Sequence, residues 1–187
     1  GDLLALGEVL TEHLSDTLFI APDAPWKCSI SPVGFQWFPI PWIDGSSEQE
    51  ASEKLELVSK EINQWINEVL TKESVEDKNA FLFGFSQGTM LSLHIGPRRS
   101  QSLGGIIGCS GKIVDIDSLR RNLNSKPPVL LIHGDQDDVV DFSFLNKAVE
   151  ELESQNFTVK KHVSRGIGHG ISPDGLKVAL DFLLNLT

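Results

Sequence analysis

The stretch that most constrains this chain is an apolar run that ends at a serine between two glycines. Residues 80–83 read Ala-Phe-Leu-Phe and lead into Gly84-Phe85-Ser86-Gln87-Gly88, after which a helical pattern continues to Gly96-Pro97. Strand, sharp turn and helix are the context of a nucleophile elbow, where glycines allow the backbone to approach closely. An ordinary turn at a strand end is the alternative. The pattern favours acyl transfer by Ser86, with the N–H groups that follow it facing a developing oxyanion.

The composition indicates one globular domain spanning residues 1–187 that does not bind nucleic acid. Sixteen basic and 26 acidic residues give a net charge of −10, and the basic residues form only scattered doublets. The two cysteines, Cys28 and Cys109, are compatible with a reducing compartment, so we expect a cytoplasmic protein. The sequence has no apolar run of the roughly 18 residues that a membrane span needs, and no integral membrane segment is expected.

Strand-like and helix-like segments alternate along the chain. This alternation predicts an α/β fold with a mostly parallel sheet covered by helices on both faces, and with no separate lid domain. Ser47 with Glu50, and Ser172 with Pro173, are helix-start signals. The expected helices begin near Leu3, Ser47, Ser86, Phe144 and Ser172, and the expected strands are 17–21, 80–83, 103–109, 129–133 and 158–164.

The segment Pro22–Gly45 is too long for a simple connection, and it holds five of the nine prolines and three of the four tryptophans. Its aromatic content argues against disorder. We expect Phe35, Trp37 and Phe38 to form an apolar wall for a substrate. The alternative is that these rings only cap the core.

A serine nucleophile needs a general base, and five histidines are available. His94 lies eight residues along the helix from Ser86, about 12 Å of rise away, so it cannot return to the serine. His169 lies in a glycine-rich loop between a strand and the last helix and is the preferred base, with His133 as its rival. The acid that orients the histidine would come from the aspartates after the strand 129–133, which are Asp135, Asp137, Asp138 and Asp141.

Two other interpretations of these residues are weaker. A calcium loop would need a further oxygen ligand and then glycine after Asp137, where this chain has Val139 and Val140, so no metal site is predicted. Ser110 also follows a strand, but it lacks the glycine two places further on that the G-x-S-x-G pattern requires. It is therefore a poor rival nucleophile.

Five motifs in chain order resemble the phospholipase/carboxylesterase family of α/β hydrolases, which includes acyl-protein thioesterases and small carboxylesterases. They are residues 21–25, Gln36-Trp37-Phe38, Gly84-Phe85-Ser86-Gln87-Gly88, His133-Gly134-Asp135-Gln136-Asp137 and Gly168-His169-Gly170. The resemblance implies Ser86 as nucleophile, Asp137 as acid, His169 as base and the Gln87 N–H as half of the oxyanion hole. The chain departs from the family pattern at Asp138 and Asp141, where prolines are usual. Because of this departure, Asp135 and Asp138 stay alternatives for the acid.

By this resemblance, the chain is expected to be a cofactor-independent serine esterase acting on carboxylic esters or thioesters with short to medium acyl chains. The alternatives are a lysophospholipase or acyl-protein thioesterase, and a catalytically inactive fold that binds a lipid or protein. The expected partner is a small acyl substrate, and a homodimer is allowed. Family members begin with a further strand and a loop that supplies the second oxyanion donor, so we expect roughly 20 to 30 residues upstream of Gly1.

Overall fold

The computed structural model describes residues 2–29, 31 and 33–186, and a four-stranded parallel sheet forms its centre. The strands lie in the order β3 (Phe81–Phe85), β4 (Gly105–Cys109), β5 (Val129–Gly134) and β6 (Val159–Ser164). The register places Phe85 opposite Cys109 and His133 opposite Val163. Because the strands are parallel, the loops after Phe85, Cys109, Gly134 and Ser164 meet at the edge of the sheet formed by the carboxyl ends of the strands, where ligands bind in open α/β folds.

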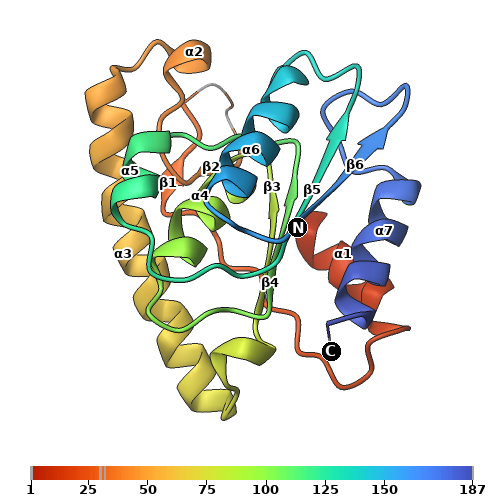
Figure 1. Cartoon of the computed structure of the whole chain (residues 1–187). Helices are drawn as coiled ribbons and strands as arrows, with labels where there is room; N and C mark the ends of the chain where they lie inside the picture. Colours follow the sequence, from red (N-terminus) through yellow and green to blue (C-terminus); the bar gives the residue numbers. More distant parts are fainter. Residues whose placement is uncertain (1, 30, 32, 187) are drawn as a thin grey trace.

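Helices cover both faces of this sheet (Figure 1), as the alternation of segments predicts. Helices α1 (Asp2–Thr11) and α7 (Pro173–Leu184) pack on the face that carries Ile107 and Leu130. Helices α4 (Gln87–Ile95), α5 (Ile116–Arg121) and α6 (Ser143–Ser154) pack on the face that carries Ile106 and Leu131. The 26-residue helix α3 (Glu48–Glu73) lies outside α4 and shares a third apolar cluster with it.

Local capping signals give the right starts for two of these helices. The Ser47 hydroxyl accepts a hydrogen bond from the Glu50 N–H at 3.1 Å, and the Ser172 hydroxyl accepts one from the Gly175 N–H at 3.1 Å. Short 3-10 turns at η1 (Asp77–Asn79) and η2 (Gly96–Arg98) flank the elbow unit. Helix α5 has no counterpart among the predicted elements, because six residues are too few to show a helical period.

The predicted strand at Thr17–Ala21 is wrong. The segment is irregular, with Leu18 63% and Ile20 46% exposed, and only Phe19 packs against the α1 and α7 cluster. A strand is stable only when its backbone groups pair with a neighbour, and no described strand lies beside this segment. An apolar run alone therefore did not produce a strand here.

The long segment between Pro22 and Gly45 contains more structure than its composition predicts. Strands β1 (Trp26–Lys27) and β2 (Phe35–Gln36) form a small antiparallel hairpin, and helix α2 (Pro41–Asp44) follows. The Asp44 carboxylate accepts hydrogen bonds from the Ile40 and Ser46 N–H groups at 2.9 Å each, and these bonds lower the pKa of Asp44 although burial by itself would raise it. The segment is thus ordered around its own polar contacts.

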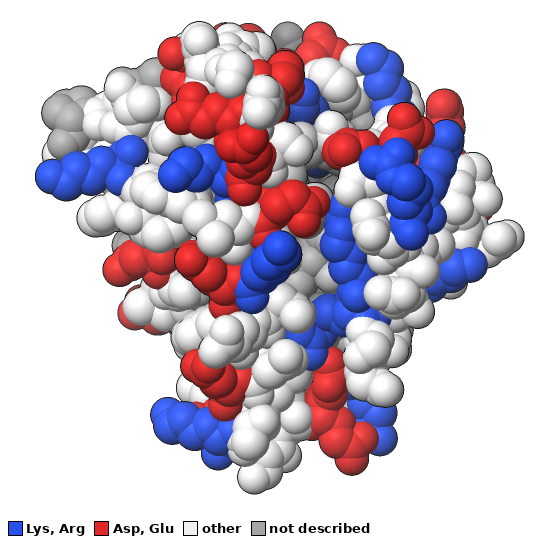
Figure 2. Space-filling model, turned by 90° about the vertical axis from the view of Figure 1, so that its left-hand side faces the viewer, with Lys and Arg blue, Asp and Glu red and all other residues white. Residues whose placement is uncertain are grey.

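Charged side chains of both signs lie at the surface of the molecule. On the face shown in Figure 2, acidic and basic side chains are interspersed, and several of the basic ones lie next to one another right of the centre of the view. Within the part of the chain that the structure describes, no helix combines the length and the apolar character needed to cross a bilayer.

Candidate active site

Ser86 lies at a sharp turn between β3 and α4, as the elbow pattern predicts. Its φ and ψ angles are 52° and −114°, in a region that non-glycine residues rarely adopt and that costs of the order of 1–3 kcal/mol. The Ser86 N–H donates to the Cys109 carbonyl at 2.9 Å, and the Ser86 carbonyl accepts the first helical bond, from Met90 N–H at 3.2 Å. The N–H of Gln87 therefore has no intrahelical acceptor and is free for an oxyanion.

Only one of the two elbow glycines is required by space. A Cβ at Gly84 would lie 2.3–2.4 Å from backbone atoms of Gly88 and Thr89, whereas a Cβ at Gly88 would meet nothing within 4 Å. The expectation that both glycines relieve a clash thus holds for Gly84 and is wrong for Gly88. Sequence reasoning also missed Thr89, whose hydroxyl lies 2.9 Å from the Gly84 carbonyl and 2.8 Å from that of Cys109, tying α4 to two strands.

The structure brings His169 and Asp137 together. Nδ1 of His169 lies 2.9 Å from Oδ2 and 3.1 Å from Oδ1 of Asp137. An ionised carboxylate only accepts, so Nδ1 carries the proton and Nε2 keeps its lone pair, the form that a general base requires. The imidazole also packs against the Phe85 ring with centroids 4.9 Å apart, which places His169 beside the residue that precedes Ser86.

The Asp137 side chain is fully buried, yet it is held in its charged form. Burial alone would raise the pKa of Asp137, but the N–H of Val140, the His169 ring and the N–H of Val139 all donate to the carboxylate. The two backbone bonds measure 2.9 Å for Val140 and 3.0 Å for Val139. The resulting pKa lies below the ordinary aspartate value, so the group stays an anion next to His169.

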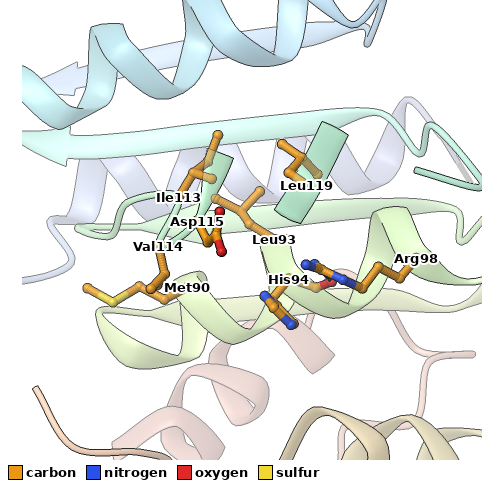
Figure 3. Close-up of a pocket in the computed structure, with 8 residues that line it drawn as sticks. All are labelled: Met90, Leu93, His94, Arg98, Ile113, Val114, Asp115 and Leu119. Carbon is orange, nitrogen blue, oxygen red and sulfur yellow. Dashed lines mark hydrogen bonds between the residues drawn. The ribbon is translucent and has the colours of Figure 1, made fainter. Parts of the chain in front are cut away.

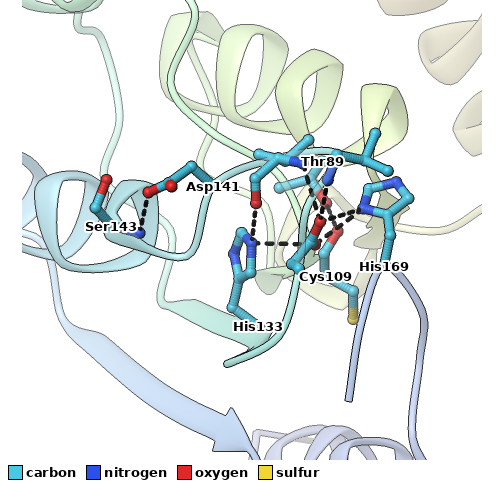
Figure 4. Close-up of polar contacts among 9 residues, drawn as sticks. Thr89, Cys109, His133, Asp141, Ser143 and His169 are labelled. Carbon is cyan, nitrogen blue, oxygen red and sulfur yellow. Dashed lines mark hydrogen bonds and ion pairs between the residues drawn. The ribbon is translucent and has the colours of Figure 1, made fainter. Parts of the chain in front are cut away.

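His133, the rival base, faces the same carboxylate from another direction (Figure 4). Its Nε2 lies 2.8 Å from the Val140 carbonyl oxygen and 3.3 Å from Oδ2 of Asp137, and the residue is 1% exposed. It is therefore a buried histidine held by hydrogen bonding. His133 therefore supports the loop of residues 135–141, called the acid loop below. Because it is enclosed, it cannot reach a substrate.

The other three aspartates of the acid loop do not approach His169. Asp135 accepts a hydrogen bond from the Gly166 N–H at 2.7 Å, which joins the acid loop to the loop that carries His169. Asp141 accepts from the Ser143 N–H at 2.8 Å at the start of α6 (Figure 4), and Asp138 is exposed. Among the four candidates, only Asp137 contacts His169 in this structure.

Ser110, the rival nucleophile, is enclosed within the fold. It is 0% exposed, and among the described residues its hydroxyl has no hydrogen-bond partner. A buried hydroxyl without a base cannot attack a substrate. Cys109 beside it is also buried, which raises the pKa of its thiol to about 12. Within the described ranges, no cluster of three or more His, Cys, Asp or Glu side chains could hold a metal ion.

A small cavity behind α4 is lined in part by His94 (Figure 3). Its lining residues are Met90, Leu93, His94, Arg98, Ile113, Val114, Asp115 and Leu119. Nε2 of His94 lies 3.0 Å from the Glu56 carboxylate, but burial, followed by the Arg98 charge, lowers the pKa of His94 to about 4. His94 is thus neutral near pH 7 and belongs to the packing between α3 and α4.

The Gln87 side chain has a role that the sequence did not reveal. Its Oε1 accepts from the Trp37 N–H at 3.0 Å, and its Nε2 donates to the Phe38 carbonyl at 2.6 Å. Both bonds span about 50 positions of the chain. Gln87 therefore fixes the segment of residues 22–45, called the aromatic segment below, against the elbow, in addition to offering its backbone N–H.

The three residues of the expected aromatic wall lie in different environments. Phe35 is 59% exposed, Trp37 is half-buried and packs at the edge of the cluster between α3 and α4, and Phe38 is 2% exposed inside it. Phe38 therefore fits the alternative in which the ring caps the core. Phe35 and Trp37 keep surface that a substrate could contact.

Comparison with known proteins agrees with this arrangement. The family model described as Phospholipase/Carboxylesterase matches residues 2–187. Acyl-protein thioesterase 1 homolog 1 of Dictyostelium discoideum is 27% identical over 98% of this chain and 83% of its own length. Carboxylesterase SOBER1 of Arabidopsis thaliana is 30% identical over 89% of this chain and 76% of its own length.

Solved structures show the same fold. The crystal structure of esterase PE8 superposes with a TM-score of 0.93 at 35% identity, covering 100% of this chain and 86% of that one. That of Arabidopsis thaliana SOBER1 gives a TM-score of 0.75 at 28% identity, covering 93% and 86%. The match of nearly the whole sequence and the agreement in fold show that this chain belongs to the phospholipase/carboxylesterase family of α/β hydrolases.

Proposed function

We propose that Ser86, His169 and Asp137 form a catalytic triad that hydrolyses carboxylic esters or thioesters of short to medium acyl chains. Membership of the family makes the chain an ester hydrolase of the carboxylesterase type, and its relatives are named as thioesterases and carboxylesterases. The observation that carries the residue assignment is the 2.9 Å contact between His169 Nδ1 and Asp137 Oδ2, with the imidazole packed on Phe85 next to the elbow.

Each residue would have a definite task in the reaction. Nε2 of His169 takes the proton of the Ser86 hydroxyl as the oxygen attacks the acyl carbon, and the Gln87 N–H stabilises the oxyanion. His169 then gives the proton to the departing alcohol or thiol, which leaves an acyl-enzyme. Water, activated by the same histidine, releases the acid and restores Ser86. Asp137 keeps His169 in the right tautomer and stabilises the imidazolium.

The inactive-fold alternative is not favoured. The acid and the histidine are in contact, the elbow keeps its strained serine, and the Gln87 N–H is free. A lysophospholipase or acyl-protein thioesterase would use the same residues, so the choice among ester substrates rests on contacts with the exposed surface of Phe35 and Trp37. The free thiols of Cys28 and Cys109 support the proposed cytoplasmic location. The homodimer stays a prediction, which size-exclusion chromatography can test.

The test combines labelling with turnover. The wild-type protein should react with a fluorophosphonate probe and hydrolyse p-nitrophenyl esters from acetate to octanoate. Ser86→Ala should lose labelling, and both Ser86→Ala and His169→Ala should lose at least about 10⁴-fold in turnover, because the residues act as one unit. Ser110→Ala is the matched control and should keep its labelling. Wild-type turnover by Ser86→Ala would refute the assignment.

A further inference from the structure

Lys112 begins beside the nucleophile elbow. It follows Gly111, where a Cβ atom would lie 3.0 Å from the Ser86 carbonyl oxygen. The side chain extends from there to two aromatic rings that come from other parts of the chain. Its Nζ lies 3.6 Å from the centroid of the Trp42 ring in α2 and 4.8 Å from that of the Phe144 ring in α6. Lys112 therefore joins the aromatic segment and α6 at the edge of the sheet that carries Ser86.

The rings hold the ammonium but leave its charge unpaired. Cation–π contact stabilises a cation without neutralising it or accepting its three N–H bonds in the way that oxygen does. Within residues 2–29, 31 and 33–186, no carboxylate lies within 4.0 Å of the Lys112 ammonium, and no oxygen accepts a hydrogen bond from it. The acid whose charge favours the protonated form of Lys112 is Glu48, which lies beyond 4.0 Å.

A second cation strengthens the positive potential at this place. Nζ of Lys147 lies 4.9 Å from the same Phe144 ring, on the first turns of α6. Burial lowers the pKa of Lys112, Glu48 raises it, and the Lys147 charge lowers it. The Lys147 charge also lowers the pKa of Asp141. Two ammonium groups thus converge on one ring in a chain whose net charge is −10. An overall negative protein repels anions, so such a local pair would be needed to attract one.

We propose that Lys112, with Lys147 behind it, binds an anionic group of the substrate, a carboxylate or a phosphate on the acyl chain or on the leaving group. This proposal rests on the proposed function of Ser86 and narrows its substrate class to esters that carry negative charge. Lys112 is partly exposed and directly follows Gly111, which packs against the Ser86 main chain, so an anion bound by Lys112 would belong to an ester held at the same end of the sheet as Ser86. A contact of this kind contributes about fivefold in binding.

The experiment measures selectivity between matched esters. Mono-p-nitrophenyl adipate is compared with p-nitrophenyl hexanoate for a carboxylate, and 1-hexanoylglycerol 3-phosphate with 1-hexanoylglycerol for a phosphate. Lys112→Met keeps the aliphatic stem and removes the charge, and it should lower the anionic-to-neutral ratio of kcat/KM by about fivefold in one of the pairs. The pair that responds identifies the anion. Lys112→Arg should keep most of the ratio.

Lys72→Met is the matched control, because it removes the same charge at the far end of α3, where Lys72 pairs with Glu73. An unchanged ratio in both pairs for Lys112→Met, or an equal fall for Lys72→Met, would overturn the proposal. If Lys112→Met does not fold, the wild-type ratio should fall between 20 and 500 mM NaCl, and a salt-independent ratio would count against it. Loss of turnover in Ser86→Ala with unchanged selectivity in Lys112→Met would reject only the role of Lys112.

Discussion

The clamp made by the Gln87 side chain can be tested by Gln87→Leu. Leucine has a similar volume, and it keeps the backbone N–H that is assigned to the oxyanion. It removes both the bond from the Trp37 N–H at 3.0 Å and the bond to the Phe38 carbonyl at 2.6 Å. The substitution therefore separates the structural role of the side chain from the catalytic role of the main chain.

The expected cost follows from the two backbone groups that lose their partners. A buried donor or acceptor left without a hydrogen bond costs about 1–3 kcal/mol, and water reaches part of this segment, so we take about 1 kcal/mol for each group. The total is about 2 kcal/mol. For a chain of this size, each kcal/mol lowers Tm by about 2–4 °C, which gives a fall of roughly 4–8 °C.

Differential scanning calorimetry measures this shift, and Gln64→Leu is the control. Gln64 lies exposed on α3 and, among the described residues, its side chain donates only to Glu68, so its loss should change Tm by about 1 °C or less. Because the Gln87 side chain also positions Trp37, which keeps surface that an acyl chain could contact, Gln87→Leu should also lower kcat/KM for longer acyl chains. A Tm shift in Gln87→Leu no larger than that in Gln64→Leu would show that the clamp does not hold the segment.

Four further substitutions test the site and its surroundings. Asp137→Asn should lower kcat by about 10⁴-fold, because it favours the wrong tautomer of the histidine, whereas Asp138→Asn, at an exposed position, should change kcat little. If an ester assay gave the reverse order, Asp138 would be the acid. Gly84→Ala should destabilise the protein by several kcal/mol in urea unfolding, since its Cβ would lie 2.3 Å from Gly88 backbone, and a neutral result would contradict that close approach. The pKa of His94 is about 4 in the folded protein, below the 6.5 of an ordinary histidine. As the pH falls, the unfolded chain therefore binds the proton before the folded protein does, and the free energy of unfolding should fall by about 3 kcal/mol between pH 7.5 and 4. His94→Gln should flatten that pH dependence, and an unchanged slope would place its origin elsewhere.

The chain's local signals were sufficient for most of the fold. The apolar run before Ser86, the serine caps at Ser47 and Ser172, and the alternation of strand and helix patterns each depend on residues within one or two turns of each other. Such signals are carried by backbone geometry and side-chain period, so they can be read without knowing the rest of the molecule. The elbow, the parallel sheet and the covering of both its faces were accordingly predicted.

Contacts between distant segments required the tertiary structure. Four aspartates stand within seven positions, and although the family resemblance implies Asp137, only the structure shows which of them contacts His169. The Gln87 bonds to residues about 50 positions away have no signature in sequence spacing. Thr17–Ala21 has the composition of a strand but no neighbouring strand to pair with among the described residues. Phe35 and Phe38 are chemically alike, yet packing between α3 and α4 buries one and leaves the other exposed. Local patterns determine what each segment can form, whereas its partners in space decide which hydrogen bonds and apolar contacts it actually makes.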